Sequence, residues 1–319
     1  MEQFRTYSPE DIILSNLDET ADRQALLFEQ ELAHIADFAR EWVQNHPQNE
    51  DLISSLSDIG MLTSNLQPHE HPPHYRKLLQ RLEEIHTLEK HYLLSREIGQ
   101  HITNDPCELI NLLFPETENQ AEHRSPRIHY QKNSFTDAAY LQFAKLFEAP
   151  RASYTHSYQS SCEDVFRNLY EYCILPIENT TEGRMVAFLK MIDRYALKLI
   201  ATCDIPVSDG TKSTRFALLG NRIIQPKALK KGIPCFFEIS CRMEASSSPS
   251  EWLTAASLCD LQVISIHTLP DEENDGNSCC HVVFALNDQS ALTTFLIYLA
   301  IRLPQFIAVG LYLHLPFLK

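Results

Sequence analysis

Short apolar runs alternate with amphipathic segments between residues 127 and 205, and this alternation constrains the fold most strongly. Brief apolar runs are typical of strands, and apolar residues at helical spacing are typical of helices. The pattern predicts strands at 127–130, 154–158, 173–177 and 198–205, and helices at 137–147, 161–172 and 185–196. Ser161 is the expected N-cap of the second helix. Such alternation favours an α/β layer with parallel strands.

The strand predicted at 173–177 leads into polar residues that suit ligand binding. It reaches a proline and is followed directly by Glu178, Asn179 and Thr180. In parallel sheets, ligands bind beyond the carboxyl ends of the strands. The position therefore indicates a ligand site, although Glu178 and Thr180 could equally cap the helix that follows.

The C-terminal segment, residues 230–319, shows a second pattern. It predicts strands at 234–242, 262–267, 280–286 and 308–314, with helices at 250–258 and 289–302. The order β-α-β-β-α-β is that of a ferredoxin-like sandwich.

The first 120 residues differ in charge from the rest of the chain. They carry 22 acidic and 8 basic side chains, whereas residues 121–319 carry 20 and 19. Apolar residues at helical spacing predict long helices at 18–43 and 75–101 with a short helix at 50–62 between them. We therefore expect three domains, at 1–120, 121–225 and 230–319, and a fold class of α/β plus α+β with a helical N-terminal domain.

Composition argues against several kinds of protein and site. The 8 glycines are isolated, so no glycine-rich nucleotide-binding loop can form. The 9 cysteines contain no C-x-x-C pair and give neither a disulfide framework nor a zinc signature. His69, His71 and His74 lie among prolines, where solvated side chains are the expectation. We expect no metal and no cofactor.

Two kinds of partner are not expected either. A net charge of −15 repels phosphate backbones, so nucleic acid is a poor partner. The N-terminus has no basic and apolar pattern of a signal peptide, and the most apolar run, near residues 295–299, meets Arg302 and Pro304 too soon to span a membrane. We expect a cytoplasmic protein without a membrane partner.

Three motifs carry a resemblance to prephenate dehydratase, the enzyme of phenylalanine synthesis. The run ILPIENTTEGRM at 174–185 resembles the family's Pro-Ile-Glu-Asn-Ser motif, and STRFALLG at 213–220 resembles its Thr-Arg-Phe motif. SFTDAAYLQFA at 134–144 is similar to the family's first helix start. The C-terminal pattern is similar to the ACT domain that follows the dehydratase and binds phenylalanine. The acidic block has the size and position of a chorismate mutase, and LLSREIG at 93–99 is similar to that enzyme's last helix.

The resemblance implies a fold and a set of site residues. The fold would be a single α/β lobe of the prephenate dehydratase type, which is periplasmic-binding-protein type II-like. Thr214 would be the catalytic residue that assists departure of the substrate hydroxyl. The implied substrate-binding residues are Glu178, Asn179, Thr180, Gly183, Arg215 and Phe216. In this set Asn179 would hold a substrate carboxylate, and Thr180 would replace the usual serine.

The sequence also departs from the family in ways that bear on activity. In the family, a second lobe lies between the strand that matches 198–205 and the threonine motif, whereas six residues, 208–213, stand there in this chain. Six residues can form a hairpin turn but no lobe. In the C-terminal segment Ser250, Glu251 and Trp252 replace the family's Gly-Ala-Leu of the phenylalanine site.

Three functions follow from these comparisons of motifs. The chain is expected to be a degenerate relative with a binding or regulatory role. Alternatives are an active dehydratase, converting prephenate to phenylpyruvate, water and CO2 with another subunit completing its site, or a chorismate mutase with an altered site. The expected ligand is prephenate-like or an aromatic amino acid. We also expect a homodimer, because helices with a single apolar stripe need a partner surface.

Overall fold

The computed structural model describes most of the chain from residue 125 onward and parts of the N-terminal block. The described residues are 30, 33, 35–44, 52–64, 73–102, 109, 113, 125–207, 212–223, 233–243, 249–270, 278–286, 289–303 and 305–317; for 60–64, 73–87, 270, 289 and 290 this holds for the backbone only. The turn at 208–211, the acidic segment at 271–277 and the histidines at 69 and 71 lie outside the described residues.

The segment from 127 to 220 forms an α/β region whose elements follow the predicted order. They are β1 (Arg127–Gln131), α5 (Ser134–Phe143), the short 3-10 helix η1 (Ala144–Leu146), β2 (Arg151–Thr155), α6 (Tyr158–Phe166), β3 (Tyr172–Asn179), β4 (Gly183–Arg184), α7 (Val186–Arg194), β5 (Lys198–Pro206) and β6 (Ser213–Gly220). Strands β2, β1 and β3 are parallel, whereas β6 runs antiparallel between β3 and β5. The predicted parallel layer therefore holds for three strands, and a hairpin returns the chain through β6.

The predicted boundaries of α6 are wrong at both ends. Ser157, not Ser161, caps the helix, because the Ser157 hydroxyl accepts a hydrogen bond from the Ser160 amide. Ser161 is buried inside the helix and donates to the Tyr158 carbonyl at 2.7 Å. The helix ends at Phe166, and Tyr172 already begins β3. Both serines have a side chain that can cap a helix, and Ser157 does so here.

The segment from 235 to 315 has the predicted β-α-β-β-α-β order. Its elements are β7 (Cys235–Met243), α8 (Ser250–Leu258), β8 (Gln262–Pro270), β9 (Ser278–Ala285), α9 (Gln289–Arg302) and β10 (Ile307–Leu315). The strands are arranged β10-β7-β9-β8, and all neighbours among them are antiparallel. This is the strand order of a ferredoxin-like sheet.

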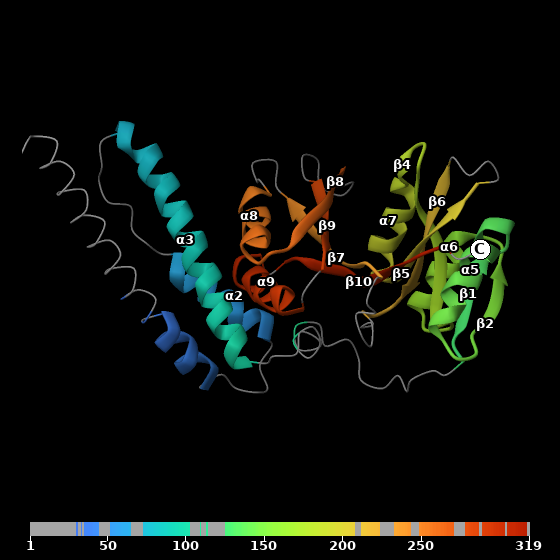
Figure 1. Ribbon diagram of the computed structural model, residues 1–319, viewed down its shortest axis with the longest axis horizontal. Helices are drawn as coiled ribbons and strands as arrows, with labels where there is room; N and C mark the ends of the chain where they lie inside the picture. Colours follow the sequence, from blue (N-terminus) through green and yellow to red (C-terminus); the bar gives the residue numbers. More distant parts are fainter. Residues whose placement is uncertain are drawn as a thin grey trace, which may run out of the picture.

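One continuous sheet joins the two regions. Its order is β2-β1-β3-β6-β5-β10-β7-β9-β8, with β4 paired to β3. The joint is the parallel pair of β5 and β10, so the last strand of the chain runs from the ferredoxin-like part into the α/β part (Figure 1). The predicted boundary at 225–230 stays a prediction, but the strands on its two sides share backbone hydrogen bonds.

The N-terminal block is helical where it is described. Residues 35–44, α2 (Leu52–Ser64) and α3 (Pro73–Ile102) are helices, and α2 and α3 pack on α9 (Figure 1). The predicted proline-broken loop at 67–74 overlaps the start of α3, because Pro73 occupies its first position, where a proline is tolerated. No helix of the described part of the chain is long and apolar enough to cross a membrane.

Two apolar cores cover the two faces of the sheet. One core joins α2, α3, α5, α8 and α9 to one face through residues such as Phe143, Phe237 and Phe295. The second core lies under α6 and α7 and includes Val165, Leu189 and Tyr312. Helix α7 belongs to the α/β region, and Tyr312 belongs to the ferredoxin-like strand β10. The second core therefore contains apolar side chains from both regions and packs them against each other.

Candidate functional site

Four polar side chains meet where β3, β5 and β10 end and β6 begins. We call Glu178, Asp204, Arg215 and His314 the strand-end cluster. Arg215 binds Asp204 with two nitrogens, Nε to Oδ1 at 2.8 Å and Nη2 to Oδ2 at 3.1 Å. Its Nη1 also donates to Glu178 Oε2 at 3.1 Å. Each nitrogen of the guanidinium thus donates one hydrogen bond to a carboxylate of its own chain.

The electrostatics of the cluster follow from this pairing. Burial by itself would raise the pKa of Asp204, but hydrogen bonds from His314 and Arg215 hold this pKa well below its usual range. Nε2 of His314 lies 3.4 Å from Asp204 Oδ2, and its Nδ1 lies 3.0 Å from the Thr202 hydroxyl oxygen. The Asp204 carboxylate therefore stays ionised beside the permanent cation of Arg215.

Asn179 and Thr214 lie opposite each other in the antiparallel pair of β3 and β6. The pair Glu178 and Arg215 is the next one along the same ladder. Successive residues of a strand point to opposite faces. The predicted site residues are consequently divided, with Thr214 on the α5 face and Arg215 on the α6 and α7 face.

The polar groups after β3 are largely used within their own turn. The side-chain oxygen Oδ1 of Asn179 accepts from the backbone amides of Thr181 at 2.9 Å and Glu182 at 2.6 Å. The Thr180 hydroxyl accepts from the Ser213 amide at 3.1 Å. Gly183 has a φ of +74°, a conformation that favours glycine. These contacts are those of a turn. The predicted capping of the following helix is wrong, because the N-cap of α7 is Met185 without a side-chain cap hydrogen bond, and Glu178 and Thr180 bond to β6 instead.

Phe216 is not at the site surface. It is 3% exposed and belongs to the core under α5. Its predicted role in substrate binding therefore has no contact surface in this structure, because the pleat of β6 turns its ring inward beside Leu218. The hydroxyl of Thr214, in contrast, makes no hydrogen bond to another described residue, and the residue is half-buried.

A buried ionic network next to the cluster was not predicted. Nη1 of Arg184, the residue after Gly183, lies 3.0 Å from Glu238 Oε1 on β7, and the Tyr312 hydroxyl donates to Glu238 Oε2 at 3.1 Å. Glu238 is fully buried. Burial by itself would raise its pKa, but Arg184 and His281 hold the pKa of Glu238 at about 2.

The network continues through His281 to α7. His281 Nδ1 lies 3.6 Å from Glu238 Oε1, and its Nε2 lies 3.2 Å from Asp193 Oδ2. Burial by itself would lower the pKa of His281, but Asp193, Cys279 and Glu238 raise it to about 11. A glutamate inside the apolar run CFFEIS was the available signal, since buried carboxylates are almost always paired. The sequence could not identify the partner 54 residues away.

A groove of about 1090 Å³ runs beside this network. It lies between the C-terminal half of α7 and the face of the ferredoxin-like sheet that α8 and α9 leave open. Lys190, Asp193, Tyr195, Arg242, Cys279 and Ile307 are among its lining residues. None of the predicted site residues lines it, so the groove and the strand-end cluster are separate features.

The fold is similar to that of solved prephenate dehydratases. The structure of prephenate dehydratase from Streptococcus mutans has a TM-score of 0.50 and 17% sequence identity, covering 60% of this chain and 99% of that chain. A structure described as GqqA, a novel type of quorum quenching acylase, has a TM-score of 0.48 and 15% identity over 60% of this chain and 95% of that chain. Prephenate dehydratase in complex with L-Phe from Arthrobacter aurescens has a TM-score of 0.46 and 13% identity, with coverages of 58% and 89%.

These comparisons support the fold and no more. No model of a known protein family matches the chain, and no curated protein matches it. The likeness to the Streptococcus mutans enzyme, at this identity, establishes a prephenate dehydratase-like fold.

Proposed function

We propose that the chain is a prephenate dehydratase-like protein that does not catalyse the dehydration and has a binding or regulatory role in aromatic amino acid biosynthesis. The pairing of Arg215 with Asp204 and Glu178 carries this proposal. Prephenate is a dianion, so an active site must offer cations to its carboxylates. The permanent cation of the strand-end cluster is already matched by two carboxylates, and the neighbouring Arg184 is engaged by Glu238.

Three further observations support the loss of catalysis. The side-chain oxygen of Asn179 already accepts hydrogen bonds from two backbone amides of its own turn. Thr214 lies on the opposite face of the sheet from Arg215. Strands β5 and β6 follow each other in the chain, and Pro206 pairs with Ser213 at the end where they are connected. The short segment between these two residues has room for a turn. Catalysis of this kind needs preorganised donors in a site that excludes water. A single missing donor typically costs a factor of about 10²–10³ in rate.

The test is steady-state turnover of prephenate to phenylpyruvate by the purified full chain and by Thr214→Ala. We expect no rate above the uncatalysed background for either protein. Ser213→Ala, which removes the neighbouring hydroxyl, is the matched control. A robust rate that collapses in Thr214→Ala and survives in Ser213→Ala would overturn the proposal. A parallel assay of chorismate conversion to prephenate tests the altered-mutase alternative.

A second candidate is an active dehydratase whose site is completed by another subunit. The observation that favours it is the half-buried Thr214 hydroxyl, which makes no hydrogen bond to the other described residues and lies opposite Asn179. This candidate predicts a specific activity that rises with protein concentration in the same assay. If no activity is found at any protein concentration, this candidate is ruled out.

We further propose that the ferredoxin-like unit is ACT-like and that the protein is a homodimer. The long helix α3 and the edge strand β8 of the described sheet provide surfaces for pairing, and Ile264 and Ile266 on β8 are exposed. The expected ligand of the protein is prephenate-like or an aromatic amino acid, and calorimetric titrations with prephenate and with L-phenylalanine test it. Light scattering at micromolar concentration tests the dimer, and a monomeric mass contradicts it.

A further inference from the structure

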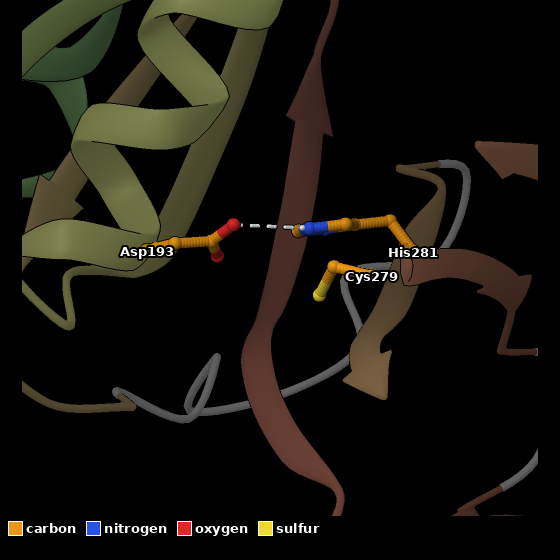
Figure 2. A group of neighbouring side chains, drawn as sticks. All are labelled: Asp193, Cys279 and His281. Atoms are coloured by element: carbon orange, nitrogen blue, oxygen red, sulfur yellow. Dashed lines mark hydrogen bonds and ion pairs between the residues drawn. The ribbon is translucent and has the colours of Figure 1, made fainter. Parts of the chain in front are cut away.

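Three potential metal ligands converge at the wall of the groove. Asp193 is at the end of α7, and Cys279 and His281 are two residues apart on β9, so both β9 side chains share one face (Figure 2). One ligand atom from each residue lies within 4.8 Å of the other two. The carboxylate Oδ2 of Asp193 lies 3.2 Å from Nε2 of His281. These residues come from two regions that only the folded sheet brings together.

The distances suit a tetrahedral ion. Zinc bonds of roughly 2.0–2.3 Å to oxygen, nitrogen and sulfur place pairs of ligand atoms roughly 3.5 Å apart. The separation of 3.2 Å between Asp193 and His281 already matches this value. The thiol of Cys279 lies 2.9 Å from the Ser240 hydroxyl oxygen and within 4.8 Å of the ligand atoms of both Asp193 and His281.

The second ring nitrogen of His281 faces a carboxylate. A metal-binding histidine commonly directs its second ring nitrogen to a carboxylate, which orients the ring. Nδ1 of His281 faces Glu238 at 3.6 Å, and Glu238 is fixed by Arg184 and Tyr312. At 3.6 Å this contact is an ion-pair distance and not a hydrogen bond, and Nδ1 has no hydrogen-bond partner among the described residues. The contact of Nε2 with Asp193 Oδ2 at 3.2 Å directs the ring toward α7.

The cluster is also reachable from solvent. Asp193 and Cys279 line the groove, whereas His281 is 1% exposed behind them. A three-ligand site on a groove wall leaves a fourth position for water or a ligand, which is the arrangement of open zinc sites. If Cys279 were instead a thiol activated by the imidazole, Nε2 of His281 would have to face the Cys279 sulfur alone. In this structure the Asp193 carboxylate approaches Nε2 as well.

We propose that Asp193, Cys279 and His281 bind a zinc-type divalent cation whose fourth coordination position faces the groove. The sulfur, nitrogen and oxygen donors favour Zn²⁺ over Mg²⁺ or Ca²⁺, which prefer oxygen ligands. Binding releases one proton from the Cys279 thiol and one from the His281 ring, so the bound metal replaces the present ion pair between His281 and Asp193. The metal would join α7 to β9 across the junction. The inference is independent of the proposed function.

Cobalt provides a direct probe of this site. The full chain is stripped with a chelator and titrated with Co²⁺ without oxygen. We expect a near-ultraviolet thiolate-to-cobalt charge-transfer band that saturates at one ion per chain and disappears when Zn²⁺ is added. Histidines elsewhere in the chain, including His69, His71 and His74, cannot produce this band because it requires a thiolate.

Matched variants assign the band to the cluster. Cys279→Ser should abolish it, whereas Cys280→Ala, which removes the adjacent thiol on the opposite face of β9, should keep it. Asp193→Asn should weaken Co²⁺ affinity about tenfold or more. Its side chain is 37% exposed, so this variant is expected to fold, and circular dichroism checks that. Absence of the band in the folded wild-type chain, or its persistence in Cys279→Ser, would overturn the proposal and leave the ion pair alone.

Discussion

At the scale of single residues, the decisive feature is which groups the Arg215 guanidinium binds. A motif comparison treats this arginine as a residue for substrate, but its guanidinium is bound by Asp204 on one side and Glu178 on the other. The three side chains come from three adjacent strands of the sheet, β3, β6 and β5, and lie at the same end of these strands. An arginine so placed stabilises the strand ends and keeps two carboxylates from repelling each other.

Arg215→Leu should therefore lower the free energy of unfolding by about 1–2 kcal/mol, because it leaves two carboxylates without their cation. The effect is limited since both Arg215 and Asp204 are partly solvated. Urea unfolding gives the measurement. Arg167→Leu is the control, because Arg167 and Glu163 form an exposed helix pair that should contribute less than about 0.5 kcal/mol. Equal losses for both variants would contradict the structural role of Arg215.

The same cluster predicts a dependence of stability on pH. Its partners Arg215 and His314 depress the pKa of Asp204 in the folded state. A depressed pKa contributes stability above the unfolded value of about 3.9, and this stability is lost as the pH falls through the folded value. Between pH 5 and pH 3, wild type should lose more stability than Asp204→Asn, as measured by urea midpoints. Parallel pH profiles of the two proteins would count against the depressed pKa.

At the scale of elements, the junction of β5 and β10 depends on a glycine. A Cβ at Gly310 would lie 2.6 Å from the Leu199 carbonyl oxygen and 2.7 Å from the Leu199 Cβ. The register shifts at this point of the ladder, where the two backbones come close. The neighbouring atoms belong to backbone and to the root of a side chain, so they cannot move aside cheaply.

Gly310→Ala should consequently cost about 1–3 kcal/mol of stability through overpacking. Gly99→Ala is the control, because its Cβ would meet the flexible end of Ile297 at 3.3 Å and alanine favours the helix. Thermal unfolding of the two variants makes the comparison. A Gly310→Ala protein as stable as wild type would show that the two strands can separate without loss.

At the scale of the whole molecule, a buried ion pair ties the α/β region to the ferredoxin-like sheet. Arg184 and Glu238 are 9% and 0% exposed, and their contact joins β4 to β7. Loss of Arg184 would take from the buried Glu238 carboxylate the cation at 3.0 Å and leave it with His281 at 3.6 Å and the Tyr312 hydroxyl. The pair therefore makes unfolding of the two regions cooperative, although they lie in separate parts of the sequence.

Arg184→Met should lower stability by about 3–5 kcal/mol. The double variant Arg184→Met with Glu238→Leu should recover part of this loss, because it removes the unpaired carboxylate. Urea unfolding followed by two probes, tryptophan fluorescence and circular dichroism, measures the change and detects whether the transitions separate. A single variant as stable as wild type would argue against the tie.

The sequence by itself determined the local elements. Periodicity predicted the β-α-β-β-α-β order and the strand that ends at the motif, because alternation and helical spacing are properties of neighbouring residues. It also placed Asn179 and Thr214 on neighbouring strand ends, since the motifs marked both ends. It misplaced the cap of α6, where two serines competed and only packing could choose.

The tertiary structure alone decided which functional side chains pair with one another. Whether Arg215 faces a substrate or two carboxylates depends on the pleat and on the register of β6 between β3 and β5. The pairing of Arg184 with Glu238, and the meeting of Asp193 with Cys279 and His281, need β10 to join β5 and so bring α7 over the open sheet. Long-range pairings of this kind come from sheet topology and burial, and no short stretch of sequence encodes them.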